Sequence, residues 1–188
     1  RHFSPVPFPE RPSFLLLSRL IRDKGIREYI EAARQVKRRH PEVDFRLAGF
    51  IDERPSAIKR HELARWEQEG TIDYLGHLKD VRPALGDTSV YVLPSYREGL
   101  PLSVLEAMAM GRPIITTDVP GCRETVNDGE NGYLVPPRSP EHLAVAMERF
   151  LARPETIQQF GRASRRMTEN RFNVHDINHA MLNAMSLK

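Results

Sequence analysis

Short apolar runs of strand length recur along the chain and alternate with amphipathic stretches. The apolar runs lie at 13–18, 43–48, 71–75, 89–93, 113–117 and 132–135. The amphipathic stretches lie near 25–39, 56–69, 80–86 and 102–110, and the last part, at 140–151, 154–169 and 173–186, is helical by its pattern. Most of the apolar runs are continuous rather than alternating, which indicates strands buried on both faces. We therefore expect an α/β domain, a Rossmann-like parallel sheet of about six strands with helices on both faces.

Two local signals predict helix boundaries. Ser139 before Pro140 offers an N-cap and a proline in the first turn, which is typical of a helix start. Gly111 follows Met110 and precedes Pro113, which indicates a helix end.

Proline also marks the opening of the chain. Residues 1–12 are too rich in proline for a helix or a central strand, so they are predicted to be an extended linker. The domain proper is then expected over 13–172, followed by a C-terminal helix within 173–188. A start of this kind also suggests that further protein belongs on the N-terminal side.

Composition narrows the class of protein. The chain has 188 residues, a formal charge of +3 and one cysteine, Cys122, which cannot form an internal disulfide. No apolar run approaches the roughly 20 residues that a membrane-spanning helix needs. The seven histidines show no metal-ligand spacing and no Asp-x-Asp sequence is present, so we expect no metal and no other cofactor. These features indicate a globular domain of a reducing, cytoplasmic compartment.

Basic residues cluster in two places despite the small net charge. Lys37, Arg38 and Arg39 are adjacent, and Arg162, Arg165 and Arg166 are close in sequence. Such clusters could contact anionic lipid or nucleic acid, but we favour a solvated helix face. No aromatic residues interleave with them as single-stranded nucleic acid requires, so we expect no nucleic-acid partner.

The first candidate binding loop follows the run at 13–18. Arg19 stands at the end of the expected strand, and Lys24 stands at the entrance of the next helix. In such folds ligands bind at the carboxyl ends of strands, where loops lead into helix N-termini. Two cations beside unpaired helix N–H groups would suit a diphosphate. Because basic residues are common in loops, a solvated loop is the alternative.

The second candidate loop links the run at 89–93 to the helix at 102–110. Glu98 is at its crest beside Gly99, which lets a backbone approach a ligand closely. Glu106 follows two turns into a mostly apolar helix that offers little solvated face. Two such carboxylates could hold sugar hydroxyls, one on a hexose and one on a ribose. Paired carboxylates also suggest hydrolysis, but these come from one loop–helix unit rather than from opposite sides of a bond.

The third candidate loop follows the run at 113–117 at the same expected edge of the sheet. Its Arg123 and Glu124 are candidates for ligand contact. Cys122 could be a nucleophile near a helix N-terminus, but no motif supplies a partner histidine, so we favour a packed side chain.

In their order along the chain, these loops resemble the C-terminal domain of family-4 glycosyltransferases, which have the two-domain GT-B architecture. Glu98 and Glu106 stand at the E-x7-E spacing of that family. The resemblance runs from about residue 13 to the end, and each matching segment is short. The segments are Ser18-Arg19-Leu20, Lys24-Gly25, Leu75-Gly76-His77-Leu78, Pro94-Ser95, Glu98-Gly99, Leu105 to Pro113, and Asn131-Gly132-Tyr133-Leu134-Val135.

The resemblance implies a catalytic set of Arg19, Lys24 and Glu98. The two cations would hold the donor diphosphate and stabilise the charge that builds on it as the glycosidic bond breaks, without a metal. Glu98 would bind hydroxyls of the donor sugar, helped by the backbone N–H groups of Gly99 and Leu100.

The remaining donor contacts implied by the resemblance involve the nucleoside. Glu106 would bind the ribose, and Leu78 would meet the base largely through its backbone. Pro101 stands where many relatives have a second glycine, and it supplies no N–H for such contacts.

The finer sequence of the second and third loops is similar to a bacterial subgroup that builds surface polysaccharides. Its members include transferases of N-acetylgalactosamine to undecaprenyl-diphosphate-linked sugars. This implies retaining transfer of a hexose or N-acetylhexosamine from a nucleoside-diphosphate sugar, with UDP favoured, to a glycan or lipid-linked acceptor. It also implies that the full enzyme works at the inner face of the cytoplasmic membrane, with peripheral membrane association.

The resemblance further implies an N-terminal acceptor-binding domain that this sequence lacks. The helix expected at 173–186 would pack back on it. We therefore expect the chain alone to bind donor nucleotide but to transfer no sugar.

Three alternatives stay open at this point. A UDP-sugar 2-epimerase shares the architecture but needs further acid–base residues. A non-catalytic nucleotide-sugar-binding module would keep the same binding residues. A purely structural α/β module would bind no nucleotide.

Overall fold

The computed structural model describes residues 3–172, and a six-stranded sheet of parallel neighbours forms its centre. The strands are β1 (Ser13–Leu17), β2 (Asp44–Ala48), β3 (Asp73–Tyr74), β4 (Val90–Leu93), β5 (Ile114–Thr117) and β6 (Gly132–Val135). Their order is β3-β2-β1-β4-β5-β6. From β1 the chain moves outward through β2 and β3 and returns to β4 on the other side, so the strand order switches between β1 and β4. Ligands bind at such switch points in α/β sheets.

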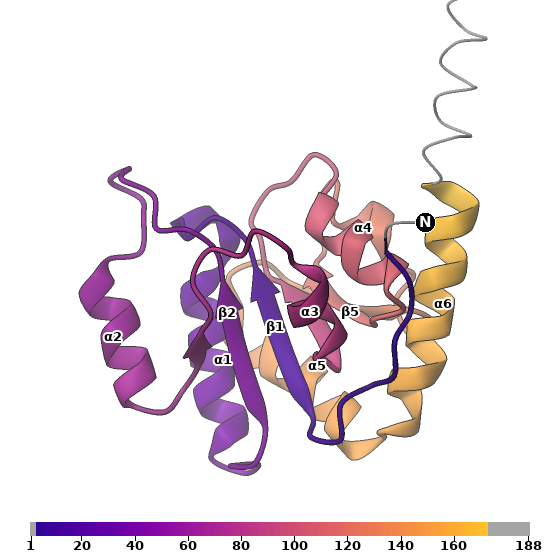
Figure 1. The fold of residues 1–188 in the computed structure, drawn as a ribbon, viewed down its shortest axis with the longest axis horizontal. Helices are drawn as coiled ribbons and strands as arrows, with labels where there is room; N and C mark the ends of the chain where they lie inside the picture. The colour runs from indigo at the N-terminus through magenta and orange to yellow at the C-terminus, as the bar shows by residue number, and fades with distance from the viewer. Residues whose placement is uncertain (1–2, 173–188) are drawn as a thin grey trace, which may run out of the picture.

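Helices cover both faces of the sheet, as the sequence predicts (Figure 1). They are α1 (Ile26–Lys37), α2 (Arg60–Gln68), α3 (Arg82–Gly86), α4 (Leu102–Ala109), α5 (Pro140–Ala152) and α6 (Glu155–Arg171), with short 3-10 turns η1 (Arg22–Lys24) and η2 (Arg123–Thr125). One face packs on α1 and α5, and the other packs on α3, α4 and the last turns of α6. The helix predicted at 173–186 lies outside the described residues.

No helix among residues 3–172 is both long and apolar enough to cross a membrane.

The central strands are buried on both faces, which explains their continuous apolar sequence. In β1, Phe14 and Leu16 belong to the core beneath α1 and α5, and Leu15 belongs to the core on the other face. Phe14 stacks on Phe45 of β2 with ring centroids 5.2 Å apart. A strand between two helical layers needs apolar side chains at every position, so alternation is lost.

The predicted helix end at Gly111 is confirmed. The predicted helix start at Pro140 is confirmed as well, but the predicted cap by the Ser139 side chain is wrong. Gly111 ends α4 in a left-handed conformation with φ of 72°, and its N–H donates to the Met108 carbonyl at 2.9 Å. α5 does begin at Pro140, but the Ser139 side chain does not cap it. Its hydroxyl instead contacts Nδ1 of His142 at 2.7 Å, because that imidazole competes with the backbone N–H groups.

The proline-rich opening has no helix or strand, as predicted, but it is held against the domain. We call residues 3–8 the strap. Figure 1 shows it running alongside α6 before the chain enters β1. Nη2 of Arg112 donates to the carbonyls of Val6 at 3.1 Å and Pro7 at 3.3 Å, and Nη1 of Arg165 donates to that of Phe3 at 3.0 Å. The boundaries of the linker and domain stay predictions.

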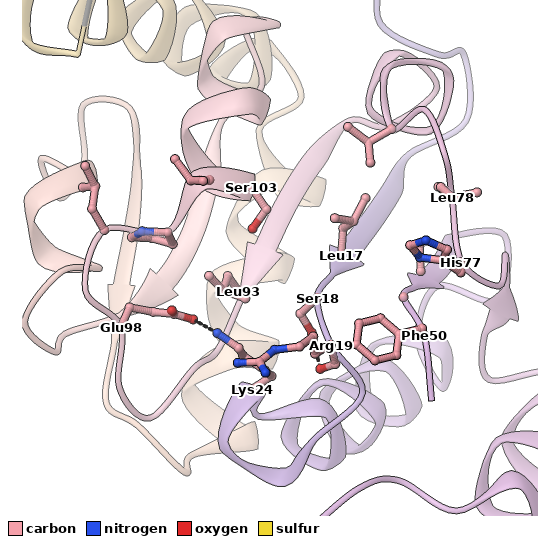
Figure 2. Close-up of a pocket in the computed structure, with 16 residues that line it drawn as sticks. Leu17, Ser18, Arg19, Lys24, Phe50, His77, Leu78, Leu93, Glu98 and Ser103 are labelled. Carbon is pink, nitrogen blue, oxygen red and sulfur yellow. Dashed lines mark hydrogen bonds and ion pairs between the residues drawn. The ribbon is translucent and has the colours of Figure 1, made fainter. Parts of the chain in front are cut away.

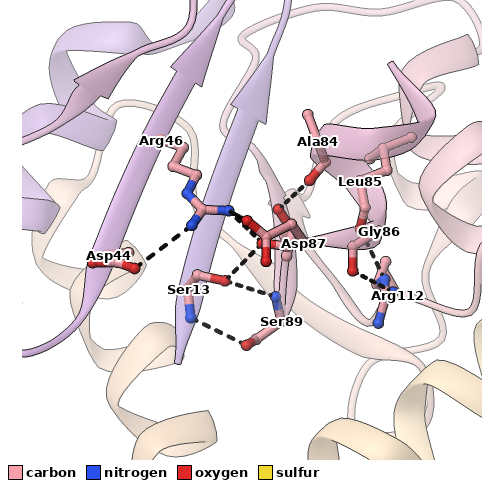
Figure 3. Close-up of polar contacts among 10 residues, drawn as sticks. Ser13, Asp44, Arg46, Ala84, Leu85, Gly86, Asp87, Ser89 and Arg112 are labelled. Carbon is pink, nitrogen blue, oxygen red and sulfur yellow. Dashed lines mark hydrogen bonds and ion pairs between the residues drawn. The ribbon is translucent and has the colours of Figure 1, made fainter. Parts of the chain in front are cut away.

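Polar side chains close the amino ends of β1, β2 and β4 (Figure 3). Ser13 and Ser89 each donate a backbone N–H to the other's hydroxyl at 3.1 Å. Nη1 of Arg46, on β2, forms an ion pair with Asp87 at 2.6 Å. Fully buried Arg112 donates to the carbonyls of Leu85 at 3.0 Å and Gly86 at 2.8 Å. We call this region the amino edge.

Candidate functional site

A cavity of about 510 Å³ lies at the opposite, carboxyl edge of the sheet, where the strand order switches between β1 and β4. Loops after β1, β2, β3 and β4 all contribute to its lining. The lining residues are Leu17, Ser18, Arg19, Lys24, Ala48, Gly49, Phe50, His77, Leu78, Val81, Leu93, Glu98, Leu100, Pro101, Leu102 and Ser103. Its volume is in the range of small-molecule binding sites.

Backbone contacts fix the loop after β1 against the loop after β4. The N–H of Tyr96 and the hydroxyl of Ser95 donate to the carbonyl of Asp23, at 2.8 and 3.0 Å. Gly25 begins α1 with φ of 68°, and a Cβ there would overlap the carbonyl oxygen of Pro94. Only glycine tolerates both the dihedral angle and this approach. The two loops therefore form one wall.

Lys24 and Glu98 meet on that wall. Nζ of Lys24 donates to Oε1 of Glu98 at 2.5 Å, and the two side chains are only 17% and 11% exposed. The family resemblance implied separate roles for these two residues, and their contact was not predicted. Each is the counterion of the other, so a ligand that brings a phosphate to Lys24 and a hydroxyl to Glu98 can replace their mutual contact with two charge-assisted ones.

Arg19 adds a second cation to the cavity. It lies two residues after the end of β1, and within residues 3–172 its guanidinium has no hydrogen-bond or ion-pair partner. An unpaired guanidinium in a cavity is suited to a bidentate oxyanion such as a phosphate.

The far side of the cavity is apolar and aromatic (Figure 2). Phe50 and His77 make an edge-to-face contact with ring centroids 5.9 Å apart, and Leu78 lies beside them. The N–H of Gly49 donates to the Gly76 carbonyl at 2.8 Å, which joins the two loops that carry these rings. A planar heterocycle fits such a wall better than a charged group does.

The structure brings five of the predicted residues to one cavity. Arg19, Lys24, Leu78, Glu98 and Leu100 all line it.

Gly99 and Glu106 are not among the lining residues. Gly99 is exposed at the loop's crest. Glu106 is half-buried on α4, three residues after Ser103, which does line the cavity. Residues three apart share a helix face, so Glu106 lies one turn behind the cavity. Burial raises the pKa of Tyr91, and the negative charges of Glu106 and Glu98 raise it further.

The third loop buttresses the wall rather than lining the cavity. Gly121 has φ of 81°, and a Cβ there would overlap the carbonyl oxygens of Gly99 and Glu98. Arg123 pairs with Asp118 at 2.5 Å on the surface, and neither it nor Glu124 lines the cavity. These two candidates for ligand contact were therefore wrong for this cavity.

Cys122 is a packed side chain, as we favoured. It is fully buried, and burial raises the pKa of its thiol. A buried thiol with a raised pKa is a poor nucleophile.

Sequence reasoning missed Gly49, Phe50, Val81 and Ser103. The usable signal was position, because Gly49 and Phe50 follow β2 as Arg19 follows β1. The carboxyl ends of neighbouring parallel strands meet at one edge, so the loop after β2 was a candidate on the same grounds.

Comparison with known sequences decides the family. The family described as "Glycosyl transferases group 1" matches residues 11–153. The chain belongs to this family. The resemblance drawn from the ordered motifs is thereby confirmed.

Two curated relatives of this group 1 glycosyltransferase chain are named for the transfer of different sugars. One is the N,N'-diacetylbacillosaminyl-diphospho-undecaprenol alpha-1,3-N-acetylgalactosaminyltransferase of Campylobacter jejuni, 33% identical over 135 residues, which are 72% of this chain and 34% of the relative. The other is the alpha-D-kanosaminyltransferase of Streptomyces kanamyceticus, 35% identical over 162 residues, 86% of this chain and 40% of the relative. The chain thus spans well under half the length of either.

Solved structures show the same fold. Sucrose-phosphate synthase from Thermosynechococcus elongatus superposes with a TM-score of 0.84 at 28% identity, covering 99% of this chain and 49% of that one. The pneumococcal O-GlcNAc transferase GtfA, solved with UDP and GlcNAc, superposes with a TM-score of 0.83 at 24% identity, covering 98% and 37%. The predicted GT-B-type domain is confirmed at the level of fold.

Proposed function

We propose that this chain is the donor-binding domain of a retaining glycosyltransferase that uses a nucleoside-diphosphate sugar. The observation that carries the proposal is one cavity with two unlike walls. Arg19, Lys24 and Glu98 form a charged wall, and Phe50, His77 and Leu78 with their neighbours form an apolar, aromatic wall. A nucleotide sugar has the matching division, with a diphosphate and hydroxyls at one end and a planar base at the other.

Each residue of the charged wall has a distinct task in this proposal. When the bond between the anomeric carbon and the diphosphate oxygen breaks, its electron pair stays on that oxygen. Arg19 and Lys24 stabilise this charge, which supplies the electrostatic part of catalysis. Glu98 accepts hydrogen bonds from sugar hydroxyls, with the N–H groups of Gly99 and Leu100 nearby in the loop.

The nucleoside contacts complete the donor site. Leu78 meets the base, and Glu106 holds the ribose from its place on α4. Because Glu106 lies one turn behind the lining residue Ser103, this contact requires the ribose to reach past Ser103.

We extend the proposal to the donor sugar, the acceptor and the kind of biosynthesis. The proposed donor is a UDP-linked hexose or N-acetylhexosamine, and the proposed acceptor is lipid-linked or a glycan, in bacterial surface polysaccharide synthesis. The name of the N-acetylgalactosaminyl relative supports an N-acetylhexosamine and a lipid-linked acceptor. The rim of the cavity exposes Leu102 at 71%, Leu100 at 44% and Phe50 at 43%. Apolar side chains around a polar cavity suit a second surface that closes over it, and we assign this role to an acceptor-binding domain.

The test is calorimetric titration of the chain with UDP, GDP and ADP. We expect UDP to bind, and Arg19→Ala/Lys24→Ala to weaken it by roughly a hundredfold, since two charge-assisted contacts are lost. The matched control, Arg38→Ala/Arg153→Ala, removes two exposed cations that do not line the cavity and should bind as the parent chain does. At about 100 times its dissociation constant, a nucleotide should add roughly 2.7 kcal/mol of stability, visible as a thermal shift.

Two outcomes would contradict the proposal. One is no binding of any of the three nucleotides, and the other is equal affinity in both double variants. We also expect no transfer to any acceptor by the chain alone. A UDP-sugar 2-epimerase would instead release an altered sugar when no acceptor is present.

A further inference from the structure

A second cavity, of about 620 Å³, lies between the strap and α6. It shares no lining residue with the cavity at the carboxyl edge. The strap residues Pro5 and Val6, together with Met110 after α4, give it an apolar wall, and Val6 is 43% exposed. Gly161 packs so closely on the Gly111 carbonyl that a Cβ would overlap it, which sets α6 against the end of α4, and Phe8 of the strap also lies close to Gly161.

The opposite wall is cationic. Arg162, Arg165 and Arg166 of α6 all line the cavity, and no aspartate or glutamate of the described part of the chain does. Arg165 forms an ion pair with Glu169 at 2.8 Å and also holds the strap. Within residues 3–172, Arg162 and Arg166 have no hydrogen-bond or ion-pair partner, and both are exposed. Two arginines without a counterion therefore face one cavity.

A third positive charge lies behind the strap. Arg112 is fully buried and donates to the carbonyls of Val6 and Pro7, but it forms no ion pair with any described carboxylate. Its Nη1 has no hydrogen-bond partner within residues 3–172, and its guanidinium lies over the ring of Phe8, 4.4 Å from the centroid. Asp87 offsets part of this charge, and the remainder makes the potential on this side of the domain more positive, because the field of a buried cation is weakly screened.

We propose that this cavity binds a phosphate-bearing lipid, independently of the transfer reaction. The phosphate lies between Arg162 and Arg166, which can each give it two N–H donors. The apolar chain lies along Pro5 and Val6, which would otherwise stay in contact with water. The mixed lining favours this ligand over nucleic acid, which would use the cations and leave the proline wall empty. Arg162 and Arg166 are exposed, as the solvated helix face favoured from sequence requires, and the proposal adds a ligand between them.

The experiment compares two probes in the Arg19→Ala/Lys24→Ala background, so that phosphate binding at the carboxyl edge makes no contribution. The probes are inorganic phosphate and dihexanoyl phosphatidate kept below its micelle concentration, both measured by calorimetry. We expect the lipid to bind at least roughly tenfold more tightly than inorganic phosphate, because only it buries apolar surface. Adding Arg162→Gln/Arg166→Gln should weaken both probes by roughly tenfold or more.

Two further variants separate the walls. Val6→Ser should weaken the lipid but leave inorganic phosphate unchanged. Arg38→Gln/Arg153→Gln carries the same charge change outside the cavity and should alter neither probe. Equal weakening by both arginine pairs, no preference for the lipid, or no binding of the lipid would each overturn the proposal.

Vesicles of phosphatidylcholine with phosphatidate identify the source of the lipid. If the protein sediments with these vesicles and Arg162→Gln/Arg166→Gln does not, the lipid is taken from a bilayer. Binding of the monomeric lipid without sedimentation would show a freely diffusing ligand. Either result supports the same cavity.

Discussion

The two edges of the sheet differ in how their polar side chains are bonded. At the amino edge, Ser13 and Ser89 bond to each other, and Arg46 is paired with Asp87. At the carboxyl edge, Arg19 has no partner among the described residues, and Lys24 and Glu98 have mainly each other, beside a cavity of about 510 Å³. Both edges are polar, so polarity alone does not distinguish a structural edge from a binding edge.

The difference is whether the polar groups are hydrogen-bonded within the chain or face a cavity that a ligand can enter. A polar group bonded within the chain contributes to the stability of the fold, and its loss exposes a buried partner without a bond. A polar group that faces a cavity contributes little to the fold and can be used by a ligand. Substitutions at the amino edge should therefore lower stability, and those at the carboxyl edge should lower ligand affinity.

The largest expected effect is at Arg112. Arg112→Ala removes the donor for the carbonyls of Leu85, Gly86 and Val6 and leaves a cavity, so we expect a loss of about 3 kcal/mol or more in the free energy of unfolding. Urea denaturation with linear extrapolation measures it. UDP affinity of the folded variant should not change.

Two variants control that measurement. Arg112→Met keeps most of the volume and removes a buried charge, so it should lose less than the alanine variant. Arg38→Ala, on the surface, should stay within about 0.5 kcal/mol of the parent. A loss below about 1 kcal/mol for Arg112→Ala would mean that the amino edge is not held as we describe.

The next effect is the reciprocal bond between Ser13 and Ser89. Ser89→Ala should lose about 1 kcal/mol, because the buried N–H of Ser13 loses its hydroxyl acceptor. Ser13→Ala should lose less, because the N–H of Ser89 still donates to the Ser13 carbonyl at 3.1 Å. In a double-mutant cycle the losses should not add, since either substitution already disturbs the shared pair. Strict additivity would show that the two serines act separately.

The sheet could be predicted from the sequence because strands that are buried on both faces appear as continuous apolar runs. β1, β4 and β5 lie between two helical layers, and every residue of β4 and β5 is buried. Their runs are mostly apolar and their few polar residues are small, namely Ser13, Thr116 and Thr117, so their length and position could be predicted. β2 is the exception, with half-buried Asp44 and Arg46, because it lies next to the short edge strand β3.

The site was predicted in part for a different reason. Arg19, Lys24 and Glu98 follow strands that end at one edge, so their gathering follows from topology. Contacts between loops do not follow from it. The pairing of Lys24 with Glu98 and the edge-to-face contact of Phe50 with His77 depend on loop backbone dihedral angles, which no pattern of apolar residues encodes.

The docking of the strap was hidden from the sequence in a similar way. Arg112 appears within a helix-ending segment, and nothing in its neighbours indicates full burial. Its partners Val6 and Pro7 lie more than 100 residues earlier in the chain, at sequence separations of 106 and 105. Long-range bonds to backbone carbonyls leave no trace in residue type, because every residue carries a carbonyl.

The smallest effect on stability should come from the carboxyl edge. Lys24→Gln removes the ion pair with Glu98 but leaves an amide that can donate to the carboxylate, and both side chains line a cavity that water can enter, so we expect a change within about 1 kcal/mol. The same variant should weaken UDP by roughly tenfold, because one charge-assisted contact to the diphosphate is lost. Urea denaturation and calorimetry on one preparation measure both quantities. If Lys24→Gln instead lost as much stability as Arg112→Ala and kept its affinity for UDP, the ion pair would be structural and the contrast between the two edges would fail.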